Sequence, residues 1–212
     1  MKILIVSGFL GAGKTTFIKR LARNVDQRFA ILENEYGAAG IDGARLGQNR
    51  QGTQKNVWEM TEQCICCIGK KDFAASVLTI ANVVDPEYLI VEPTGVGSLA
   101  RIIENLRQIE YERIQLLSPV TIVDVYSYRR YMAEYPELYQ DQIRSADTII
   151  VSKTEACQAE EKQRIQKFLQ EINPQAKIIT DYASTMTWED YQSLLLGGRY
   201  EKEVQDTQSG EK

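Results

Sequence analysis

The sequence contains no histidine, so the most common metal ligand and the most common general base are both missing. Any metal site must use thiolates, carboxylates, backbone groups or water. No apolar run approaches the roughly 20 residues that a membrane-spanning helix needs. The 25 Lys and Arg residues are outnumbered by 29 Asp and Glu residues and form no basic stripe. This balance argues against nucleic acid as the main partner.

The apolar run at the start of the chain, Ile3–Val6, is too short for a signal peptide. We therefore expect a cytoplasmic protein without a membrane partner, in which clustered thiols indicate metal or redox chemistry more often than disulfides. With 212 residues, 43% of them hydrophobic, the chain can bury one full core. We expect a single domain over residues 1–200 and a disordered polar tail over residues 201–212.

The most informative segment is a glycine-rich loop between an apolar run and a helix-compatible run. It satisfies every fixed position of the phosphate-binding loop, G-x-x-x-x-G-K-[ST]. Glycines let successive backbone N–H groups point at one anion, and the following helix adds its positive dipole end. Lys14 is predicted to reach the outer phosphates and Thr15 to ligate Mg²⁺. The residues expected to contact the nucleotide here are Gly8, Gly11, Ala12, Gly13, Lys14, Thr15 and Thr16.

Strand-like and helix-like runs alternate along the rest of the chain. Continuous apolar strands of this kind predict an α/β fold with a mainly parallel sheet covered by helices on both faces, the P-loop NTPase architecture. Ligands bind at the carboxyl ends of such strands, so Glu92, Asp124 and Lys153 should gather with the phosphate loop on one rim. The expected strands after the first are 29–34, 57–60, 88–92, 120–124, 148–151 and 177–180, and the expected helices are 16–23, 72–81, 99–106, 160–172 and 188–196.

A carboxylate and a glycine follow the predicted strand that ends at Glu92. A carboxylate beside the first strand can meet Mg²⁺ directly or through its water shell. Gly95, three residues later, has no side chain to block the approach of its N–H to a γ-phosphate. An exposed glutamate and an ordinary turn glycine are the alternative for Glu92 and Gly95 taken alone.

The segment Ser152–Glu155 follows another apolar strand, at the place where GTP-binding proteins carry Asn-Lys-x-Asp. Glu155 keeps the pair of acceptors for guanine N1–H and N2–H, and the stem of Lys153 can pack on the base. Ser152 replaces the asparagine, so we expect the brace that its amide would give the loop to be lost. An ordinary strand-to-helix turn is the alternative.

Three cysteines, Cys64, Cys66 and Cys67, form a Cys-x-Cys-Cys cluster. In an extended strand Cys64 and Cys66 share one face and Cys67 opposes them, so all three converge only if the chain turns. Thiolates suit Zn²⁺ or another soft divalent ion, with the fourth ligand a carboxylate, water or a partner's group. Buried apolar cysteines or a vicinal redox pair are the alternatives.

Several motifs occur together in one order: the phosphate loop, Glu33–Gly37 with Gly40–Asp42, the cysteine cluster, and Glu92–Gly95. In this combination the chain resembles the CobW-type GTPases, which are related to the urease and hydrogenase nickel accessory GTPases. The segments Gln142–Asp147 and Ser152–Glu155 are also similar to that family's stretch before and at the guanine motif, and the resemblance covers roughly residues 1–185.

The resemblance implies a GTP-driven metallochaperone that carries Zn²⁺ or Co²⁺ to a client metalloprotein, with GTP and Mg²⁺ as cofactors. It implies that Cys64, Cys66 and Cys67 bind the metal. It implies that Glu35 and Asp42 belong to the segment that senses the nucleotide, and that Glu35 is also a residue of the metal site. The residues expected to bind or act on GTP and Mg²⁺ outside the phosphate loop are Glu92, Gly95, Lys153 and Glu155. The family's C-terminal domain and histidine-rich tracts have no counterpart in this sequence.

Hydrolysis of GTP requires a group that orients the attacking water, and Asp42, Glu35, Glu92 or a partner residue are the candidates. Phe9 stands where some dimeric relatives carry a second lysine, so that lysine is not available here; a homodimer remains open. Three other functions remain: a P-loop kinase for a small molecule, a non-enzymatic metal or nucleotide-gated adaptor, and an accessory GTPase of a cobalt or corrinoid protein.

Overall fold

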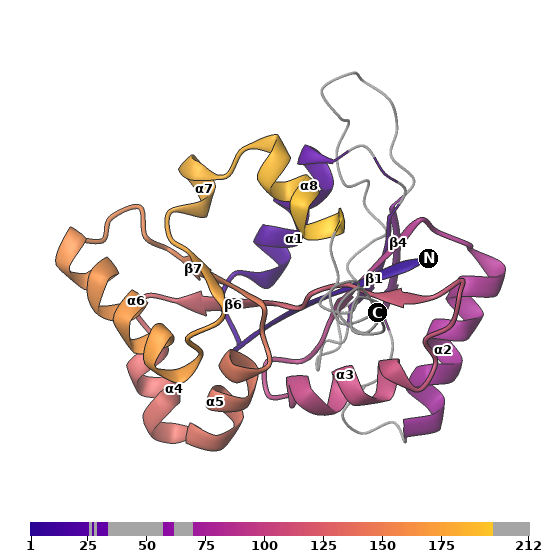
Figure 1. Ribbon diagram of the computed structural model, residues 1–212, viewed down its shortest axis with the longest axis horizontal. Helices are drawn as coiled ribbons and strands as arrows, with labels where there is room; N and C mark the ends of the chain where they lie inside the picture. The colour runs from indigo at the N-terminus through magenta and orange to yellow at the C-terminus, as the bar shows by residue number, and fades with distance from the viewer. Residues whose placement is uncertain (26, 28, 34–56, 62–69, 197–212) are drawn as a thin grey trace, which may run out of the picture.

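A computed structural model of the chain describes residues 1–25, 27, 29–33, 57–61 and 70–196. These residues form a parallel sheet between two layers of helices (Figure 1). The expected α/β architecture is therefore confirmed. None of the helices in this part of the chain is both long and apolar enough to cross a membrane.

The strands lie in the order β3-β2-β4-β1-β6-β7-β8. Every neighbouring pair is parallel. Strand β5 pairs with the first half of β1, and β6 pairs with the second half. The strands are β1 (Lys2–Gly8), β2 (Phe29–Glu33), β3 (Val57–Thr61), β4 (Tyr88–Glu92), β5 (Gln115–Leu116), β6 (Val120–Asp124), β7 (Thr148–Ser152) and β8 (Lys177–Ile179).

The helices alternate with the strands, as the sequence predicts for most of them. Helices α4, α5 and α7 were not among the expected elements. The helices are α1 (Lys14–Asn24), α2 (Lys70–Val83), α3 (Leu99–Arg107), α4 (Tyr128–Glu134), α5 (Pro136–Arg144), α6 (Ala159–Ile172), α7 (Tyr182–Thr185) and α8 (Trp188–Leu196).

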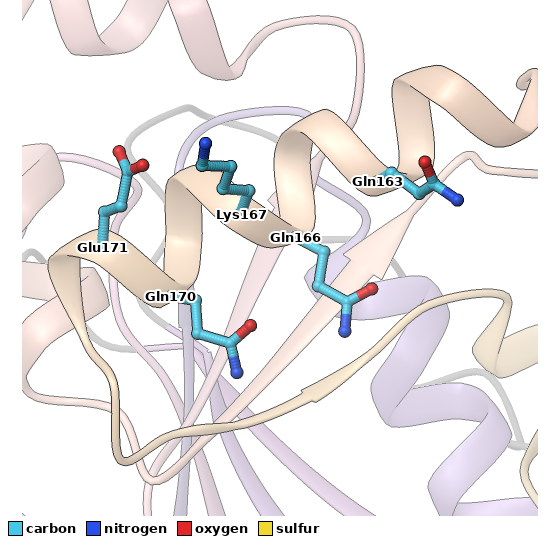
Figure 2. Close-up of a pocket in the computed structure, with 5 residues that line it drawn as sticks. All are labelled: Gln163, Gln166, Lys167, Gln170 and Glu171. Atoms are coloured by element: carbon cyan, nitrogen blue, oxygen red, sulfur yellow. The ribbon is translucent and has the colours of Figure 1, made fainter.

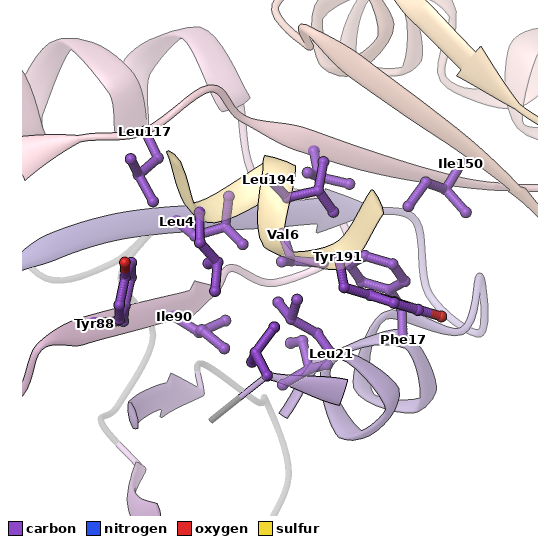
Figure 3. Close-up of a cluster of buried hydrophobic side chains, with 14 of the residues drawn as sticks. Leu4, Val6, Phe17, Leu21, Tyr88, Ile90, Leu117, Ile150, Tyr191 and Leu194 are labelled. Carbon is purple, nitrogen blue, oxygen red and sulfur yellow. The ribbon is translucent and has the colours of Figure 1, made fainter. Parts of the chain in front are cut away.

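One face of the sheet is covered by α1, α7 and α8 (Figure 1). Phe17 and Leu21 of α1 meet Tyr191 and Leu194 of α8 over the strand residues of this face, as Figure 3 shows. Burial of large apolar side chains such as these contributes about 1.5–3 kcal/mol each. This cluster fixes α1, and therefore the phosphate loop before it, against the end of β1.

The other face is covered by α2 and α3 on one side and by α4, α5 and α6 on the other. Residues of β1 alternate between the two faces: Ile3 and Ile5 face α2 and α3, whereas Leu4 and Val6 face α1 and α8. A two-residue period with both faces buried explains why the strands are continuous apolar runs. The carboxyl ends of β1, β4, β6 and β7 consequently meet at one rim.

Candidate functional site

The phosphate loop joins β1 to α1 and has the curled backbone that its glycines predict. The φ angles of Gly8, Gly11 and Gly13 are 143°, 72° and 98°, values that residues with a Cβ rarely adopt. A Cβ at Gly8 would also collide with the carbonyl oxygen of Ile122. Gly13 sits at the N-cap of α1, so the N–H groups of the first helical turn, which cannot pair within the helix, face the loop. The result is an anion cradle at a helix N-terminus.

Two oxygen-bearing side chains meet beside the cradle. The Thr15 hydroxyl lies 3.1 Å from each carboxylate oxygen of Glu92, although the two residues come from different elements. The Lys14 Nζ lies 3.9 Å from Glu92 Oε1 and donates to the Phe9 carbonyl at 3.4 Å. Hydroxyl and carboxylate oxygens are the ligands that Mg²⁺ prefers, so these side chains fit the ion that the sequence predicts. The structure therefore brings Lys14, Thr15 and Glu92 together.

The loop after β4 lies directly against the phosphate loop. A Cβ at Gly95 would stand 2.5 Å from the backbone nitrogen of Leu10, a distance that real Cβ atoms essentially never show. The Gly97 N–H donates to the Thr94 carbonyl at 3.0 Å and closes a tight turn there. Only a glycine at position 95 allows the two loops to approach this closely, which accounts for the residue type.

The serine at the start of the expected guanine motif braces the phosphate loop, and this corrects a prediction from the sequence. The Ser152 hydroxyl, which is buried, donates to the Ala12 carbonyl at 2.6 Å and lies 3.4 Å from the Val123 carbonyl. We expected the brace to be lost without the asparagine amide. The hydroxyl keeps it because the backbone of β7 ends close enough to the loop for a short side chain to reach.

The next two residues of the motif also face the same rim. Lys153 adopts a left-handed conformation with φ 61°, and its Nζ pairs with Asp124 Oδ2 at 2.8 Å. The Asp124 carboxylate is almost buried and also accepts from the Tyr126 N–H at 2.9 Å. Together with Glu92 and the phosphate loop, Asp124 and Lys153 form the rim that the strand ends predict.

The last residue of the motif, Glu155, is exposed and lies near α7. The pKa of Tyr182 is raised mainly by burial and further by the charge of Glu155. Behind the motif, Asp181 pairs with Lys162 at 2.6 Å and accepts a hydrogen bond from Thr154, and these contacts lower its pKa. The loop after β8 therefore supports the loop that carries Lys153 and Glu155.

The residues predicted to bind Zn²⁺ or Co²⁺ and those predicted to sense the nucleotide lie outside the part of the chain that the structure describes. They are Glu35, Asp42, Cys64, Cys66 and Cys67. Among the side chains described within residues 1–25, 27, 29–33, 57–61 and 70–196, no group of three or more His, Cys, Asp or Glu is placed to hold a metal ion. The metal prediction therefore stays a prediction.

Sequence reasoning assigned no site role to the residues of α4 and α5 that touch the rim. Tyr139 packs edge-on against the ring of Phe9 with centroids 5.0 Å apart, and the Tyr131 hydroxyl donates to the Leu10 carbonyl at 3.0 Å. Gln142 donates to the loop that contains Gly95. Pro136 at the first position of α5 was the available signal, because proline is favoured there.

A hollow of about 430 Å³ also opens along α6 (Figure 2). It is lined by glutamine, lysine and glutamate side chains of that helix and contains none of the predicted site residues. Its lining residues are Gln163, Gln166, Lys167, Gln170 and Glu171. All of them belong to the polar face of one helix, so the hollow gives no evidence of a binding site.

Comparison with known proteins agrees with this geometry. Residues 2–180 match the family model described as the nucleotide-binding domain of CobW, HypB and UreG. The zinc chaperone YeiR of Escherichia coli is 30% identical over 178 residues, which cover 82% of this chain and 53% of that protein. The zinc chaperone CobW of Pseudomonas aeruginosa is 27% identical over 194 residues, 78% of this chain and 52% of that protein. The chain thus spans about half the length of these relatives.

Solved structures support the fold. The zinc-bound YjiA GTPase of E. coli superposes with a TM-score of 0.64 at 23% identity, over 92% of this chain and 61% of that protein. The hydrogenase maturation factor HypB of Archaeoglobus fulgidus superposes with a TM-score of 0.60 at 20% identity, over 92% of this chain and 88% of that protein. At these identities the likeness establishes the P-loop α/β fold.

Proposed function

Because the chain belongs to the CobW/HypB/UreG family of nucleotide-binding proteins, we propose that it hydrolyses GTP and uses the reaction to deliver a soft divalent metal. The observation that carries the proposal is the contact of Thr15 with Glu92 beside the cradle of glycine N–H groups. A triphosphate needs a cradle for its phosphate oxygens and a hard-ligand site for Mg²⁺, and this rim has the groups for both.

The residues divide the work of phosphoryl transfer by charge and position. Lys14 would neutralise the outer phosphates, and the loop N–H groups would hold their oxygens. Thr15 and Glu92 would hold Mg²⁺, which when bound neutralises charge on the phosphates. Gly95 would lie at the γ-phosphate. Asp42, Glu35, Glu92 or a partner residue remain the proposed groups that orient water.

Guanine is the base we propose for this site, because the motif keeps its acceptor and its loop brace. Glu155 supplies the carboxylate, Lys153 the stem that covers the base, and Ser152 the contact to the phosphate loop. ATP lacks the N1–H and N2–H donors that a carboxylate at position 155 would accept, so GTP should bind more tightly.

The cargo we propose is Zn²⁺ or Co²⁺, bound by Cys64, Cys66 and Cys67 and passed to a client metalloprotein in the cytoplasm. Two relatives that match this chain are named as zinc chaperones. Soft thiolates favour these metals over Mg²⁺ or Ca²⁺. Delivery to a cobalt or corrinoid protein is the variant of this function that the same ligands would serve.

A nucleotide hydrolysis assay on the protein loaded with Zn²⁺ or Co²⁺ tests the proposal. Release of inorganic phosphate from GTP and from ATP is measured with the metal-loaded protein, and its zinc and cobalt content is determined by elemental analysis. Lys14→Ala should lower hydrolysis by about a hundredfold or more, since the γ-phosphate charge is left unmatched. Lys19→Ala, an exposed lysine on the same helix, is the control. Retained turnover in Lys14→Ala, or transfer of phosphate to a small molecule, would overturn the proposal.

A further inference from the structure

Helix α5 holds the loop that contains Gly95 through a buried amide. The side chain of Gln142 is 1% exposed, and its Nε2 donates to the Gly95 carbonyl at 3.1 Å and to the Gly97 carbonyl at 2.9 Å. Two carbonyl oxygens can accept only from the nitrogen end of the amide, so this orientation of the side chain is fixed by its partners. Both donors of Gln142 are therefore committed to one turn of the loop.

The orientation of the Gln142 amide that serves the loop leaves its oxygen atom without a hydrogen bond: Oε1 is buried and has no partner in the described structure. A buried polar atom without a partner is unfavourable, and the two hydrogen bonds from Nε2 to the loop offset that cost. The backbone of Gln142 is itself anchored, because its carbonyl accepts from the Thr121 hydroxyl at 2.9 Å. Helix α5 is thus fixed to β6 on one side and to the loop on the other.

The neighbouring residue fastens the far end of the same loop. Asp141 Oδ2 accepts from the Leu99 N–H at 2.7 Å and lies 3.4 Å from the Ala100 N–H, at the N-terminus of α3. A carboxylate there satisfies free N–H groups and complements the helix dipole. The loop from Gly95 to Leu99 is therefore held by α5 at both ends.

The same helix also contacts the phosphate loop. Tyr139, one turn before Gln142, packs against Phe9, whose neighbour Leu10 lies against Gly95. A shift of Gly95 would therefore have to displace contacts of both Gln142 and Leu10. Packed contacts and hydrogen bonds of this kind allow little movement without a change of the whole arrangement.

We propose that Gln142 is a positioning residue for the γ-phosphate: by holding the carbonyls of Gly95 and Gly97, it fixes the turn so that the Gly95 N–H is presented to that phosphate and not to the α- or β-phosphate. The inference rests on the proposed function. If Gln142 only stabilised the fold, its loss would weaken triphosphate and diphosphate binding equally, whereas a positioning role predicts different effects on the two. Loss of Gln142 should weaken triphosphate binding and hydrolysis, while diphosphate binding, which uses the phosphate loop and the base motif but not the Gly95 N–H, should persist.

The test compares Gln142→Met, which keeps the volume and removes the amide, with Gln140→Met on the same helix. Gln140 is half-buried, and its Nε2 lies 3.9 Å from the Met132 sulfur, so it serves as a matched control. Affinities for GDP and for a non-hydrolysable GTP analogue are measured by calorimetry, together with the kcat and KM of hydrolysis. In Gln142→Met the analogue should bind about tenfold more weakly and kcat should fall at least as much, with GDP affinity within about twofold of wild type.

An equal change in analogue and GDP affinity, or no change in either, would overturn the role of Gln142. A wild-type protein that neither binds the analogue nor hydrolyses GTP would instead contradict the proposed function. If Gln142→Met does not fold, hydrogen exchange on the wild-type protein decides the matter. The analogue should slow amide exchange in residues 94–100 and 138–144 relative to GDP, and equal exchange in 138–144 under both nucleotides would overturn the proposal.

Discussion

The Ser152 hydroxyl donates a 2.6 Å hydrogen bond to the Ala12 carbonyl, so the end of β7 is tied directly to the phosphate loop. The residue that begins the predicted base motif thus contacts the backbone of the phosphate loop. Ser152 therefore braces the loop, whereas we propose that Glu155, exposed and at the other end of the tetrad, discriminates the base. Substitution of Ser152 and substitution of Glu155 should therefore have different effects on the affinities for GTP and ATP.

Ser152→Ala should weaken GTP and ATP binding to the same extent. The substitution leaves the Ala12 carbonyl without its buried donor, and a loss of about tenfold in affinity is expected for both nucleotides. Titration of each nucleotide by calorimetry or fluorescence measures the effect. Ser193→Ala removes a serine hydroxyl of α8 that bonds the Asp190 carbonyl and should leave both affinities unchanged. A loss confined to GTP would show that Ser152 reads the base instead.

Glu155→Ala should weaken GTP binding and leave ATP binding unchanged, because only guanine donates to this carboxylate. A loss of about tenfold or more is expected for GTP, since hydrogen bonds to charged groups contribute about 1.5–3 kcal/mol. Competition titrations of GTP against ATP measure the ratio, with Glu160→Ala, another exposed glutamate nearby, as the control. Equal losses for both nucleotides would indicate that the site does not select guanine through Glu155.

Asp181 should make stability depend on pH at the loop behind the base motif. Its pKa lies below the ordinary value of 3.8, first because of the hydrogen bond from Lys162. The native state therefore favours the charged carboxylate, and the stabilisation is full above the unfolded pKa and is lost as pH falls through the folded pKa. Asp181 has φ 56°, a conformation that asparagine tolerates, so Asp181→Asn tests the charge without backbone strain.

At pH 7 Asp181→Asn should lower the free energy of unfolding by about 1 kcal/mol or less, because the pair is partly exposed. The difference from wild type should begin to shrink near pH 4 and disappear at lower pH. Denaturant unfolding between pH 7 and pH 3 measures it, and Lys162→Gln completes a double-mutant cycle. A difference that stays constant over this range would mean that the carboxylate charge contributes nothing.

The long apolar strands and the phosphate loop could be predicted from the sequence because each is specified locally. Strand β4 begins and ends at the predicted residues, Tyr88 and Glu92. Strand β5 could not be predicted: it has only two residues and exists because β1 offers an open edge there. The helices α4 and α5 were missed because their buried side chains are two tyrosines, a glutamine and a single isoleucine, Ile143, so the apolar period is weak.

The brace from Ser152 was also beyond sequence reasoning. A hydroxyl and an amide differ in reach, and whether the shorter group suffices depends on how closely β7 approaches the phosphate loop. The same holds for Gln142, whose partners lie more than forty positions away along the chain. Local patterns identify residue types at strand ends, but the contacts between loops follow from tertiary packing.

Metal and nucleotide should influence each other if the segment from Glu33 to Cys67 connects their sites. Cys66→Ser together with Cys67→Ser removes two soft ligands and should weaken Zn²⁺ or Co²⁺ binding by well over about tenfold, since hydroxyls replace thiolates poorly. Cys157→Ser is the control, because Cys157 is a half-buried free cysteine before α6. Metal binding should also release protons and strengthen toward neutral and higher pH, because the thiols must ionise to ligate.

Coupling between the sites is reciprocal, so a non-hydrolysable GTP analogue should change metal affinity by the same factor by which the metal changes affinity for the analogue. Calorimetric titration of Zn²⁺ with and without the analogue, and of the analogue with and without Zn²⁺, measures both sides of the cycle. A coupling of about 5–150-fold is typical of linked sites. Identical metal affinity in both titrations would leave a GTPase whose thiol cluster is independent of the nucleotide, because without differential binding the nucleotide cannot drive loading or release of the metal.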